Sequence, residues 1–365
     1  MRVQAHRFYT DGPSDVSGLA WLLDDGVIAA HDILAVIGKT EGNGGINDFT
    51  RELAMRALAE VLAPRLGCAP AQVEDRVVLS FSGGTEGVAS PHMLVLSRTG
   101  EPRSTPREEK RLAIATGYTR AFEPDEVGYL SMVGETARVV RELMDALRLE
   151  SPADVHLVQI KGAIPDYEPA AGERAQQAGR PLRCDMSYSR GASALGVALA
   201  VGEVSADELS DEAICRDWSL YSSVASVSSK PGLARSEITL FANSPYWDGD
   251  LHIAHGVMDD IIDIEAIRGV LDSLGIPVDG QLSRARTERL VGIFAKSDAD
   301  PRNRIRGRRH TMWTDADFSD MRYSRCVVSA LLAGITGETA VYVSTRAEHH
   351  GPLGGGPVAI IARAS

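Results

Sequence analysis

Three residue types that can act on a polar ligand recur three times along the chain in the same order. Each set has a lysine at the end of an apolar segment, an arginine at the start of a helical segment, and a serine at the end of another apolar segment. The sets are Lys39, Arg51 and Ser82; Lys161, Arg190 and Ser228; and Lys296, Arg325 and Ser344. A serine hydroxyl beside a neutral lysine forms a nucleophile and its base, so the sets predict Ser/Lys chemistry.

A lysine is a base near pH 7 only when its pKa is strongly lowered. Two charges about 7 Å apart at an effective dielectric near 20 interact by roughly 2–2.5 kcal/mol, or almost two pKa units. Six cationic side chains around one cavity would therefore repel one another, and burial acts in the same direction. We expect at least one of the three lysines to be neutral in the folded protein.

The residues after each serine are candidates for binding the ligand or an oxyanion. Gly83 and Gly84 follow Ser82 and predict a tight turn with backbone N–H groups aimed at one point. Ser229 and Thr345 stand at the positions that match Gly83. Other hydrolase and phosphate-loop signatures are absent, since the chain has no GxSxG, and a Walker motif would need glycine where Ile33 stands.

The repeat also indicates the fold. Repeats of roughly 120 residues are too long for a solenoid and fit three homologous domains. A strand and a helix precede each set, and another strand follows it. In the second set the preceding helix is expected at Pro124 to Leu130. We expect an α/β (α+β) protein with units at 1–103, 104–250 and 251–365, packed around a pseudo-threefold axis with a central site. Amphipathic helices are expected at Asp48 to Leu62, Glu135 to Leu147, Ser193 to Val201, Ile264 to Leu274 and Met321 to Leu332.

Composition excludes several classes of function. The chain has 365 residues, 44% hydrophobic and 24% charged, with a net charge of −12 that argues against nucleic acid or an anionic membrane as partner. The basic run from Arg302 to Arg309 is read as a solvated or intersubunit loop. Four cysteines without CxxC spacing, no signal-like N-terminus and no membrane-length apolar run predict a cytoplasmic protein with reduced thiols.

A glycine loop near the C-terminus is the other unusual feature. AEHHGPLGGGP, from Ala347 to Pro357, would expose several carbonyls, which are the oxygen ligands that hard cations prefer. Asp298 stands two residues after Lys296 and can supply a carboxylate. A plain structural turn is the alternative. Zinc is not expected, because His349 and His350 are adjacent and would diverge.

Longer motifs resemble a known family. GKTEGNGGINDFTRE, SGGTEGVASPH, YSRGASALG, DWSLYSSVAS, IRGRRHTM and AEHHGPLGGGPVA are similar to the cyanuric acid hydrolase/barbiturase family of ring-opening amidohydrolases. The resemblance runs from about residue 8 to the C-terminus. It implies the "toblerone" fold of three α/β units about a pseudo-threefold axis, a central active site and homotetramers.

The resemblance also implies roles for single residues. Ser228 and Lys161 correspond to the family's nucleophile and base, with Ser226 and Ser229 close enough to be confused with the nucleophile. The remaining Lys, Arg and Ser of the three sets would bind substrate. The family's structural Mg²⁺ or Ca²⁺ site falls on Asp298 and on the carbonyls of Ala347, His350, Gly351, Pro352 and Gly355.

Three functions stay open at this stage. Cyanuric acid alternates three carbonyls with three N–H groups, so the three arginines favour hydrolysis of cyanuric acid to carboxybiuret, which then yields biuret and CO₂. Barbituric acid replaces one N–H by carbon and would call for one dissimilar unit; Gly45, Lys230 and the Thr345–Arg346 pair depart from many cyanuric acid hydrolases. A non-catalytic binder of a small cyclic anion is the third reading.

Overall fold

Three four-stranded sheets form the centre of the molecule, and all three have the same strand order. The computed structural model describes residues 1–364. In each sheet the first strand pairs with the fourth, the fourth with the second, and the second with the third. The first two pairings are antiparallel and the last is parallel. Three separate stretches of sequence therefore build the same sheet.

The sheets follow one another along the chain. The first contains β1 (Arg2–Tyr9), β2 (Ile33–Thr40), β3 (Val78–Gly83) and β4 (His92–Thr99). The second contains β5 (Arg111–Tyr118), β6 (Val155–Ile164), β7 (Ala225–Pro231) and β8 (Glu237–Ser244). The third contains β9 (Leu251–Met258), β10 (Leu290–Ser297), β13 (Tyr342–Thr345) and β14 (Gly356–Arg363).

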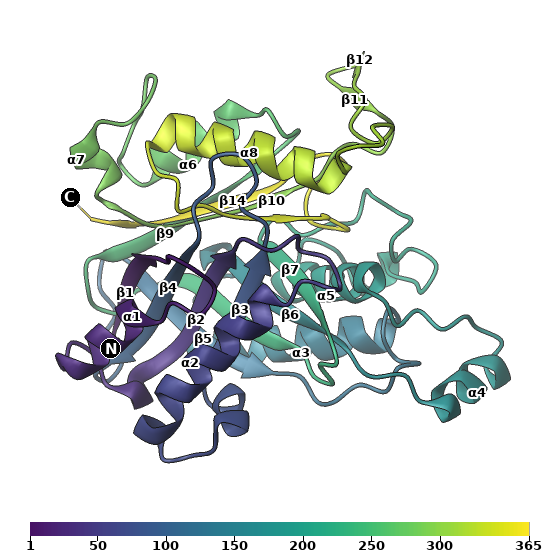
Figure 1. Cartoon of the computed structure of the whole chain (residues 1–365), viewed down its shortest axis with the longest axis horizontal. Coiled ribbons are helices and arrows are strands. Elements are labelled where there is room, and N and C mark those ends of the chain that lie inside the picture. The colour runs from purple at the N-terminus through teal and green to yellow at the C-terminus, as the bar shows by residue number, and fades with distance from the viewer. Residues whose placement is uncertain (365) are drawn as a thin grey trace.

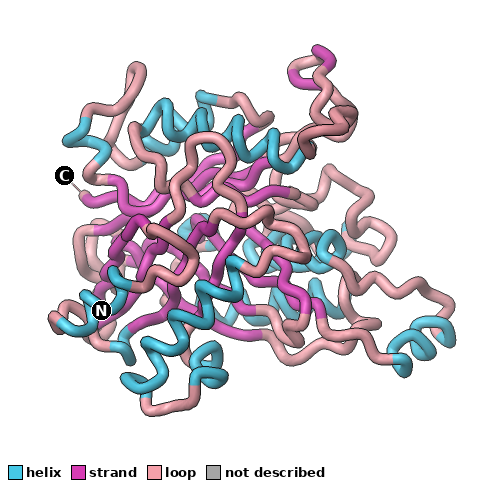
Figure 2. The backbone as a smooth tube through the Cα atoms, viewed as in Figure 1, coloured by secondary structure: helices cyan, strands magenta, loops and turns pink. Residues whose placement is uncertain are grey.

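The helices lie around the outside of the sheets (Figure 1, Figure 2). They are α1 (Ser17–Asp24), α2 (Thr50–Leu66), α3 (Leu130–Ala146), α4 (Pro169–Gln177), α5 (Met186–Val201), α6 (Ile264–Ser273), α7 (Arg284–Thr287) and α8 (Asp320–Thr336). Short 3-10 turns are η1 (Ala30–Asp32), η2 (Pro70–Asp75), η3 (Pro152–Asp154) and η4 (Ala206–Glu208). The main pairs, α1 with α2, α3 with α5 and α6 with α8, each follow the first and second strands of a sheet.

One hydrophobic core joins the inner faces of all three sheets. It includes Ile37 of β2, Ile160 of β6 and Phe294 of β10, and Phe294 packs against both Phe241 and Tyr342. Separate clusters lie under the outer helices of the first and third sheets and under α3 and α5. Because β2 and β10 are buried along their whole length, they read as continuous apolar runs that end in a lysine.

The five amphipathic helices expected are present, but α3 begins at Leu130 instead of Glu135 and α5 at Met186 instead of Ser193. The helix expected at Pro124 to Leu130 is wrong, because that segment forms turns. Arg51 lies in the first turn of α2, whereas Arg190 and Arg325 lie in the second turn of α5 and α8. In the first and third sheets the lysines and serines stand at or near strand ends, as expected, whereas in the second sheet β6 and β7 continue three residues beyond Lys161 and Ser228.

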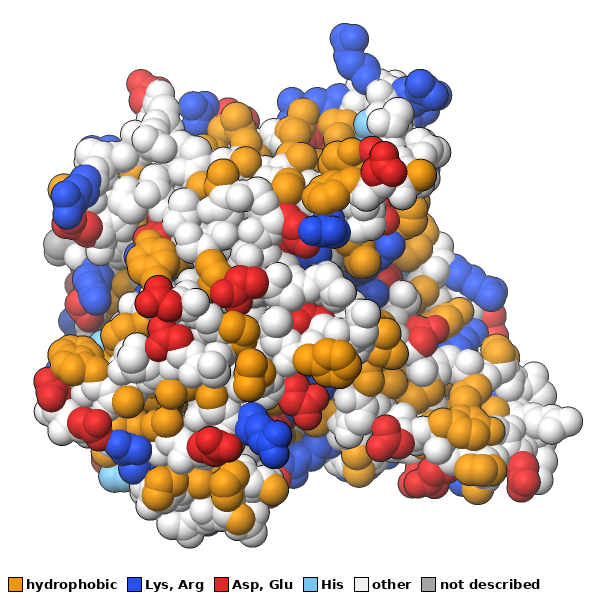
Figure 3. Space-filling model, in the orientation of Figure 1, with side chains coloured by type: hydrophobic (Ala, Val, Ile, Leu, Met, Phe, Trp, Pro, Cys, Tyr) orange, Lys and Arg blue, Asp and Glu red, His pale blue; other side chains and the backbone are white. Residues whose placement is uncertain are grey.

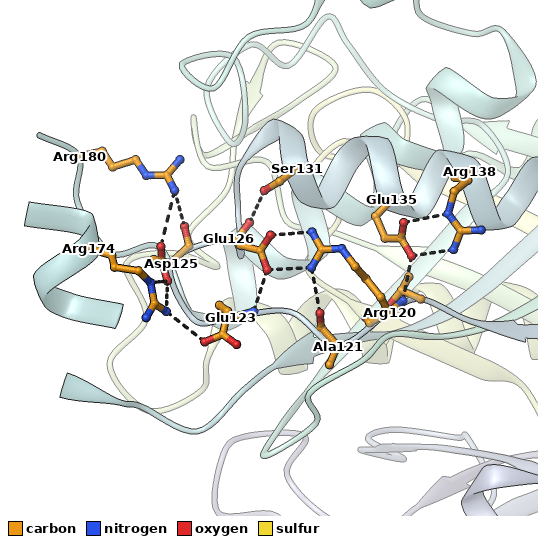
Figure 4. Close-up of polar contacts among 11 residues, drawn as sticks. Arg120, Ala121, Glu123, Asp125, Glu126, Ser131, Glu135, Arg138, Arg174 and Arg180 are labelled. Carbon is orange, nitrogen blue, oxygen red and sulfur yellow. Dashed lines mark hydrogen bonds and ion pairs between the residues drawn. The ribbon is translucent and has the colours of Figure 1, made fainter. Parts of the chain in front are cut away.

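Polar groups mark two places on the surface. The basic run forms a small hairpin, β11 (Arg304–Ile305) with β12 (Arg308–Arg309), whose arginines are exposed (Figure 3). Ion pairs from Arg174 to Asp125 and Glu123 hold α4 to the segment after β5, and a further pair, Arg120 with Glu126, lies within that segment (Figure 4). No helix within residues 1–364 is long and apolar enough to cross a membrane.

Candidate active site

Each lysine of the three sets lies directly across from its serine on the neighbouring parallel strand. Lys39 pairs in register with Ser82, Lys161 with Ser228, and Lys296 with Ser344. The distance from Nζ to Oγ is 2.8 Å for Lys161 and Ser228, and 3.3 Å in both other pairs. The three sets therefore form three Ser/Lys pairs, as the sequence predicts.

The lysines also connect the three sheets in a closed ring. Lys39 Nζ donates to the carbonyl of Val343, which precedes Ser344. Lys296 Nζ donates to the carbonyl of Val227, which precedes Ser228. Lys161 Nζ donates to the carbonyl of Phe81, which precedes Ser82. Each lysine thus touches its own serine and the strand that carries the next serine, so the three pairs gather at one centre.

Burial controls the protonation of these lysines. The three side chains are buried, and burial lowers the pKa of Lys39 and Lys161 well below the usual range and that of Lys296 to about 7. A nearby arginine is the next cause in each case: Arg325, Arg51 and Arg190 in turn. Repulsion among the cations, which the sequence analysis put first, is secondary to desolvation.

Two of the three arginines are neutralised by buried carboxylates from the neighbouring sheet. Arg190 makes two contacts of 2.8 Å with Glu348. Arg325 contacts Glu86 at 2.7 and 2.9 Å. Arg190 lowers the pKa of Glu348 to about 2, although burial alone would raise it. These two arginines help to hold the sheets together as well as facing the centre.

Arg51 is placed differently. Its Nη2 donates to the carbonyl of Gly45 at 2.6 Å, and its Nε is 3.7 Å from Asp48 of its own helix start. That carboxylate also accepts bonds from the backbone of Gly44 and from Thr50. Arg51 therefore has only a loose ion pair, and it is the one arginine of the three that is partly exposed.

The backbone after the serine explains this difference. Glu86 and Glu348 each stand four residues after the serine of their set. In both cases the residue two positions after the serine is left-handed and turns the chain: Gly84 (φ 99°) after Ser82, and Arg346 (φ 62°) after Ser344. In the second sheet β7 instead stays extended to Pro231, still paired with β6, and the fourth position is Gly232. No carboxylate follows Ser228 to neutralise Arg51.

A cavity opens beside Arg51. It has a volume of about 150 Å³, and its lining includes Arg51, Lys161, Lys230 and Phe81 together with the acidic residues Asp48 and Glu52. Ser228 is partly exposed, whereas Ser82 is 8% and Ser344 3% exposed. The second Ser/Lys pair therefore contributes its lysine to this cavity and has the most exposed serine of the three.

The residues after the serines do not form the expected oxyanion turn. The Gly84 N–H donates to the carbonyl of Thr40 at 2.9 Å, and Gly83 presents its carbonyl to Lys39 and Arg325. The Ser229 hydroxyl donates to the carbonyl of Met186, on the strand face opposite to that of Ser228. Thr345 offers its carbonyl to Lys296 at 3.2 Å. Arginine and serine side chains are better placed than these amides to meet a ligand.

The residues expected to hold a hard cation come from the end of β10 and from the loop between β13 and β14, two strands that both pair in the third sheet. Asp298 follows β10, and burial, with Glu348 adding to it, raises the pKa of its carboxyl to about 7. The loop between β13 and β14 is a tight turn in which Ala347 and Pro352 carbonyls accept backbone bonds from His350 and Gly355. No cluster of three His, Cys, Asp or Glu side chains suited to a metal occurs in residues 1–364. One buried carboxyl facing a carbonyl-rich turn still fits a hard, oxygen-seeking cation.

Sequence reasoning missed the acidic partners and one aromatic residue. Glu86 and Glu348 share a Ser-x-x-x-Glu spacing that was visible in SGGTE and STRAE. Tyr342, two residues before Ser344, has its hydroxyl at the centre, where it accepts from Gln159, and burial raises its pKa to about 12. No sequence signal distinguished this tyrosine from other core aromatics.

Comparison with known proteins places this arrangement in a family. Residues 4–363 match the model of the family described as amidohydrolase ring-opening protein. The cyanuric acid amidohydrolase of Bradyrhizobium diazoefficiens is 46% identical over 100% of this chain and 98% of its own, and that of Enterobacter cloacae is 44% identical over 100% of both. A solved cyanuric acid hydrolase superposes with a TM-score of 0.90 at 43% identity, covering 100% of this chain and 99% of the other. The chain therefore belongs to the family of ring-opening amidohydrolases.

Proposed function

We propose that the protein hydrolyses cyanuric acid to carboxybiuret, with Ser228 as nucleophile and Lys161 as its base. The observation that carries this proposal is the Lys161–Ser228 contact at the cavity, with the shortest Nζ–Oγ distance of the three pairs. Relatives that are 46% and 44% identical over the whole chain carry the name cyanuric acid amidohydrolase. The family and the site geometry thus support the same chemistry.

The hydrogen-bond partners of the lysines support the choice of Lys161. Lys39 and Lys296 each have three hydrogen-bond partners within residues 1–364, so no position on either amine is left for a reacting group. Lys161 has two partners, the Phe81 carbonyl and the Ser228 hydroxyl. A neutral amine has two N–H donors and a lone pair, so Lys161 can accept the serine proton.

The reaction follows from these groups. Lys161 Nζ takes the proton as Ser228 Oγ attacks a ring carbonyl, and the lysine then gives that proton to the ring nitrogen as the C–N bond breaks. Water hydrolyses the resulting ester and releases carboxybiuret, which loses CO₂. Arg51 stabilises the oxygen of the attacked carbonyl, since its guanidinium is the least neutralised of the three.

The rest of the centre would hold the other two carbonyls. We assign Ser82 and Ser344, with Lys39, Lys296, Arg190 and Arg325, to substrate orientation. We also propose that units 1–103, 104–250 and 251–365 are related by a pseudo-threefold axis. The common strand order and the closed ring of lysine contacts support this arrangement.

A structural cation completes the proposal. Asp298 and the carbonyls of Ala347, His350, Gly351, Pro352 and Gly355 would hold Mg²⁺ or Ca²⁺, which would compensate buried negative charge and stiffen the loop that carries Glu348. Its place behind Ser344 keeps it outside the bond-breaking steps. We further propose that the protein works in the cytoplasm as a homotetramer, which its mass in solution would test.

Barbituric acid is the second candidate substrate. Its one carbon in place of nitrogen suits a centre with one dissimilar member, and the second sheet differs from the others after Ser228. The test is purified protein with cyanuric and barbituric acids in parallel, following the loss of ring absorbance. We expect faster turnover of cyanuric acid. Binding of both rings without turnover would instead indicate a non-catalytic binder.

A further inference from the structure

Lys161 lies in the middle of a row of three polar residues on adjacent strands. Its register partner on β7 is Ser228, and its partner on β8, on the other side, is Glu237. Directly opposed residues project to the same face of a sheet, so the lysine stands between a hydroxyl and a carboxyl. The row is Ser228, Lys161, Glu237.

Only the second sheet has an acid at this place. In the first sheet, the residue across from Lys39 on β4 is His92. In the third sheet, the pairing of β10 with β14 ends at Ala295 and Val358, so Lys296 lies next to Pro357. The carboxyl therefore accompanies the one Ser/Lys pair that has the short contact, the partly exposed serine and the cavity.

Burial of Glu237 costs desolvation free energy that packing alone does not offset. It is 2% exposed, and its Oε2 has no hydrogen-bond partner within residues 1–364. Burial raises its pKa to about 7, and Glu74 adds to this. Lys230, Lys161 and Arg235 act in the opposite direction. Tyr118 is the register partner of Glu237 on β5, but its hydroxyl donates to the carbonyl of Glu74. A buried carboxyl oxygen without a protein partner needs an explanation beyond packing.

We propose that Glu237 is a positioning residue for ring opening, which acts through Lys161 by stabilising the ammonium formed when the lysine takes the Ser228 proton. This inference rests on the proposed Ser228/Lys161 mechanism. Glu237 acts as a carboxylate, which is its main form above about pH 7. The proton moves from Ser228 Oγ to Lys161 Nζ and then to the ring nitrogen, so Glu237 neither gains nor loses one. Its part resembles that of the aspartate in a Ser-His-Asp triad, which stabilises the cation formed on the base.

The decisive variant is Glu237→Gln, which keeps the shape and removes the charge. We expect kcat to fall by about 10–100-fold with the substrate dissociation constant nearly unchanged. We also expect the rising limb of the pH profile of kcat/KM to move to lower pH, because loss of a neighbouring negative charge lowers the pKa of Lys161. Glu237→Asp, which keeps the charge, should recover part of the rate.

A direct readout separates this role from a structural one. The chain has five lysines, at 39, 110, 161, 230 and 296, so ¹³C-labelled lysine spectra can follow Lys161 once its signal is assigned with Lys161→Met. Its pKa should fall in Glu237→Gln. Glu338→Gln is the matched control, since Glu338 is also buried but is bound to Arg7 and Tyr9 away from the site, and it should leave the pKa of Lys161 unchanged.

The outcomes distinguish this inference from the proposed function. Wild-type kcat and an unchanged pKa of Lys161 in Glu237→Gln, with Ser228→Ala inactive, would overturn the role of Glu237 alone. Full activity in Ser228→Ala would overturn the mechanism itself. If Glu237→Gln fails to fold, Glu237→Ala takes its place, since it also removes the charge, and a wild-type pKa of Lys161 in that variant would contradict the inference.

Discussion

Lys161 Nζ lies 2.8 Å from Ser228 Oγ, while the same contact measures 3.3 Å between Lys39 and Ser82 and between Lys296 and Ser344. The three pairs share strand order and register, so the difference comes from what surrounds them. Beside Ser228 the chain continues straight as β7, the carboxylate that would follow is missing, and the cavity opens. Similar backbone thus supports three pairs with different distances and different surroundings.

Removing either member of the second pair should abolish turnover. We expect Ser228→Ala and Lys161→Ala each to lower kcat by at least about 10³-fold, because each removes the nucleophile or its base. Substrate binding should persist, since the arginines remain. Ser82→Ala and Ser344→Ala serve as controls and should lose less activity. An active Ser228→Ala beside an inactive Ser82→Ala or Ser344→Ala would move the nucleophile to another pair.

Exchange of arginine for lysine should have different effects at the three sites. If all three arginines only bound substrate, Arg→Lys at each site would impair turnover and leave the melting temperature unchanged. The ion pairs modify this expectation: Arg190→Lys loses a buried bidentate contact with Glu348 and should destabilise the fold by about 1–3 kcal/mol. Arg51→Lys should impair turnover and change stability by less than about 0.5 kcal/mol. Thermal unfolding with steady-state kinetics compares them, and equal destabilisation would contradict the distinction.

Stability should rise with pH because of Lys296. Burial lowers its pKa to about 7 in the folded protein, whereas a lysine in an unfolded chain titrates near 10.4. Between these values the unfolded chain binds a proton that the folded one does not, so the free energy of unfolding increases by up to about 1.4 kcal/mol per pH unit. Urea unfolding between about pH 7.5 and 9 should show a smaller slope for Lys296→Met. Equal slopes would mean that folded Lys296 keeps its proton.

Metal removal should loosen the C-terminal loop. We expect metal analysis to find one Mg²⁺ or Ca²⁺ per chain, and chelation to lower both the melting temperature and the rate, because the loop carries Glu348 and hence Arg190. Asp298→Asn should reproduce the effect without chelator. Protein that is free of both metals and indifferent to chelator would leave this segment as a plain glycine turn.

The strand-end residues were predictable because their signal is local. A buried strand reads as an apolar run, so Lys39, Lys161 and Lys296 were visible where such runs stop, and so were Ser82 and Ser344. Ser228 was harder to place, because it lies in the middle of β7 among other serines. Repetition then predicted which lysine belongs with which serine, and the register of the parallel pairs agrees.

The charge balance of the centre was not predictable in the same way. Arg190 and Glu348 are 158 residues apart, and Arg325 and Glu86 are 239 apart, so only packing between sheets brings them together. The glycine pair after Ser82 was misread for a related reason: Gly84 serves the close passage of Arg325, whose guanidinium would lie 2.4 Å from an added Cβ. An oxyanion turn and a clearance for a distant side chain have the same local sequence.

The closed ring of lysine contacts limits which substitutions such a chain can accept during evolution. If each lysine served only its own serine, two of the three would be dispensable once a single pair did the chemistry. Lys39 and Lys296, however, also tether the strands that carry Ser344 and Ser228, so losing either would disturb a serine that belongs to a different stretch of the chain. Repeated residues can then be retained for their structural contacts between sheets, even when only one of the pairs carries out the reaction.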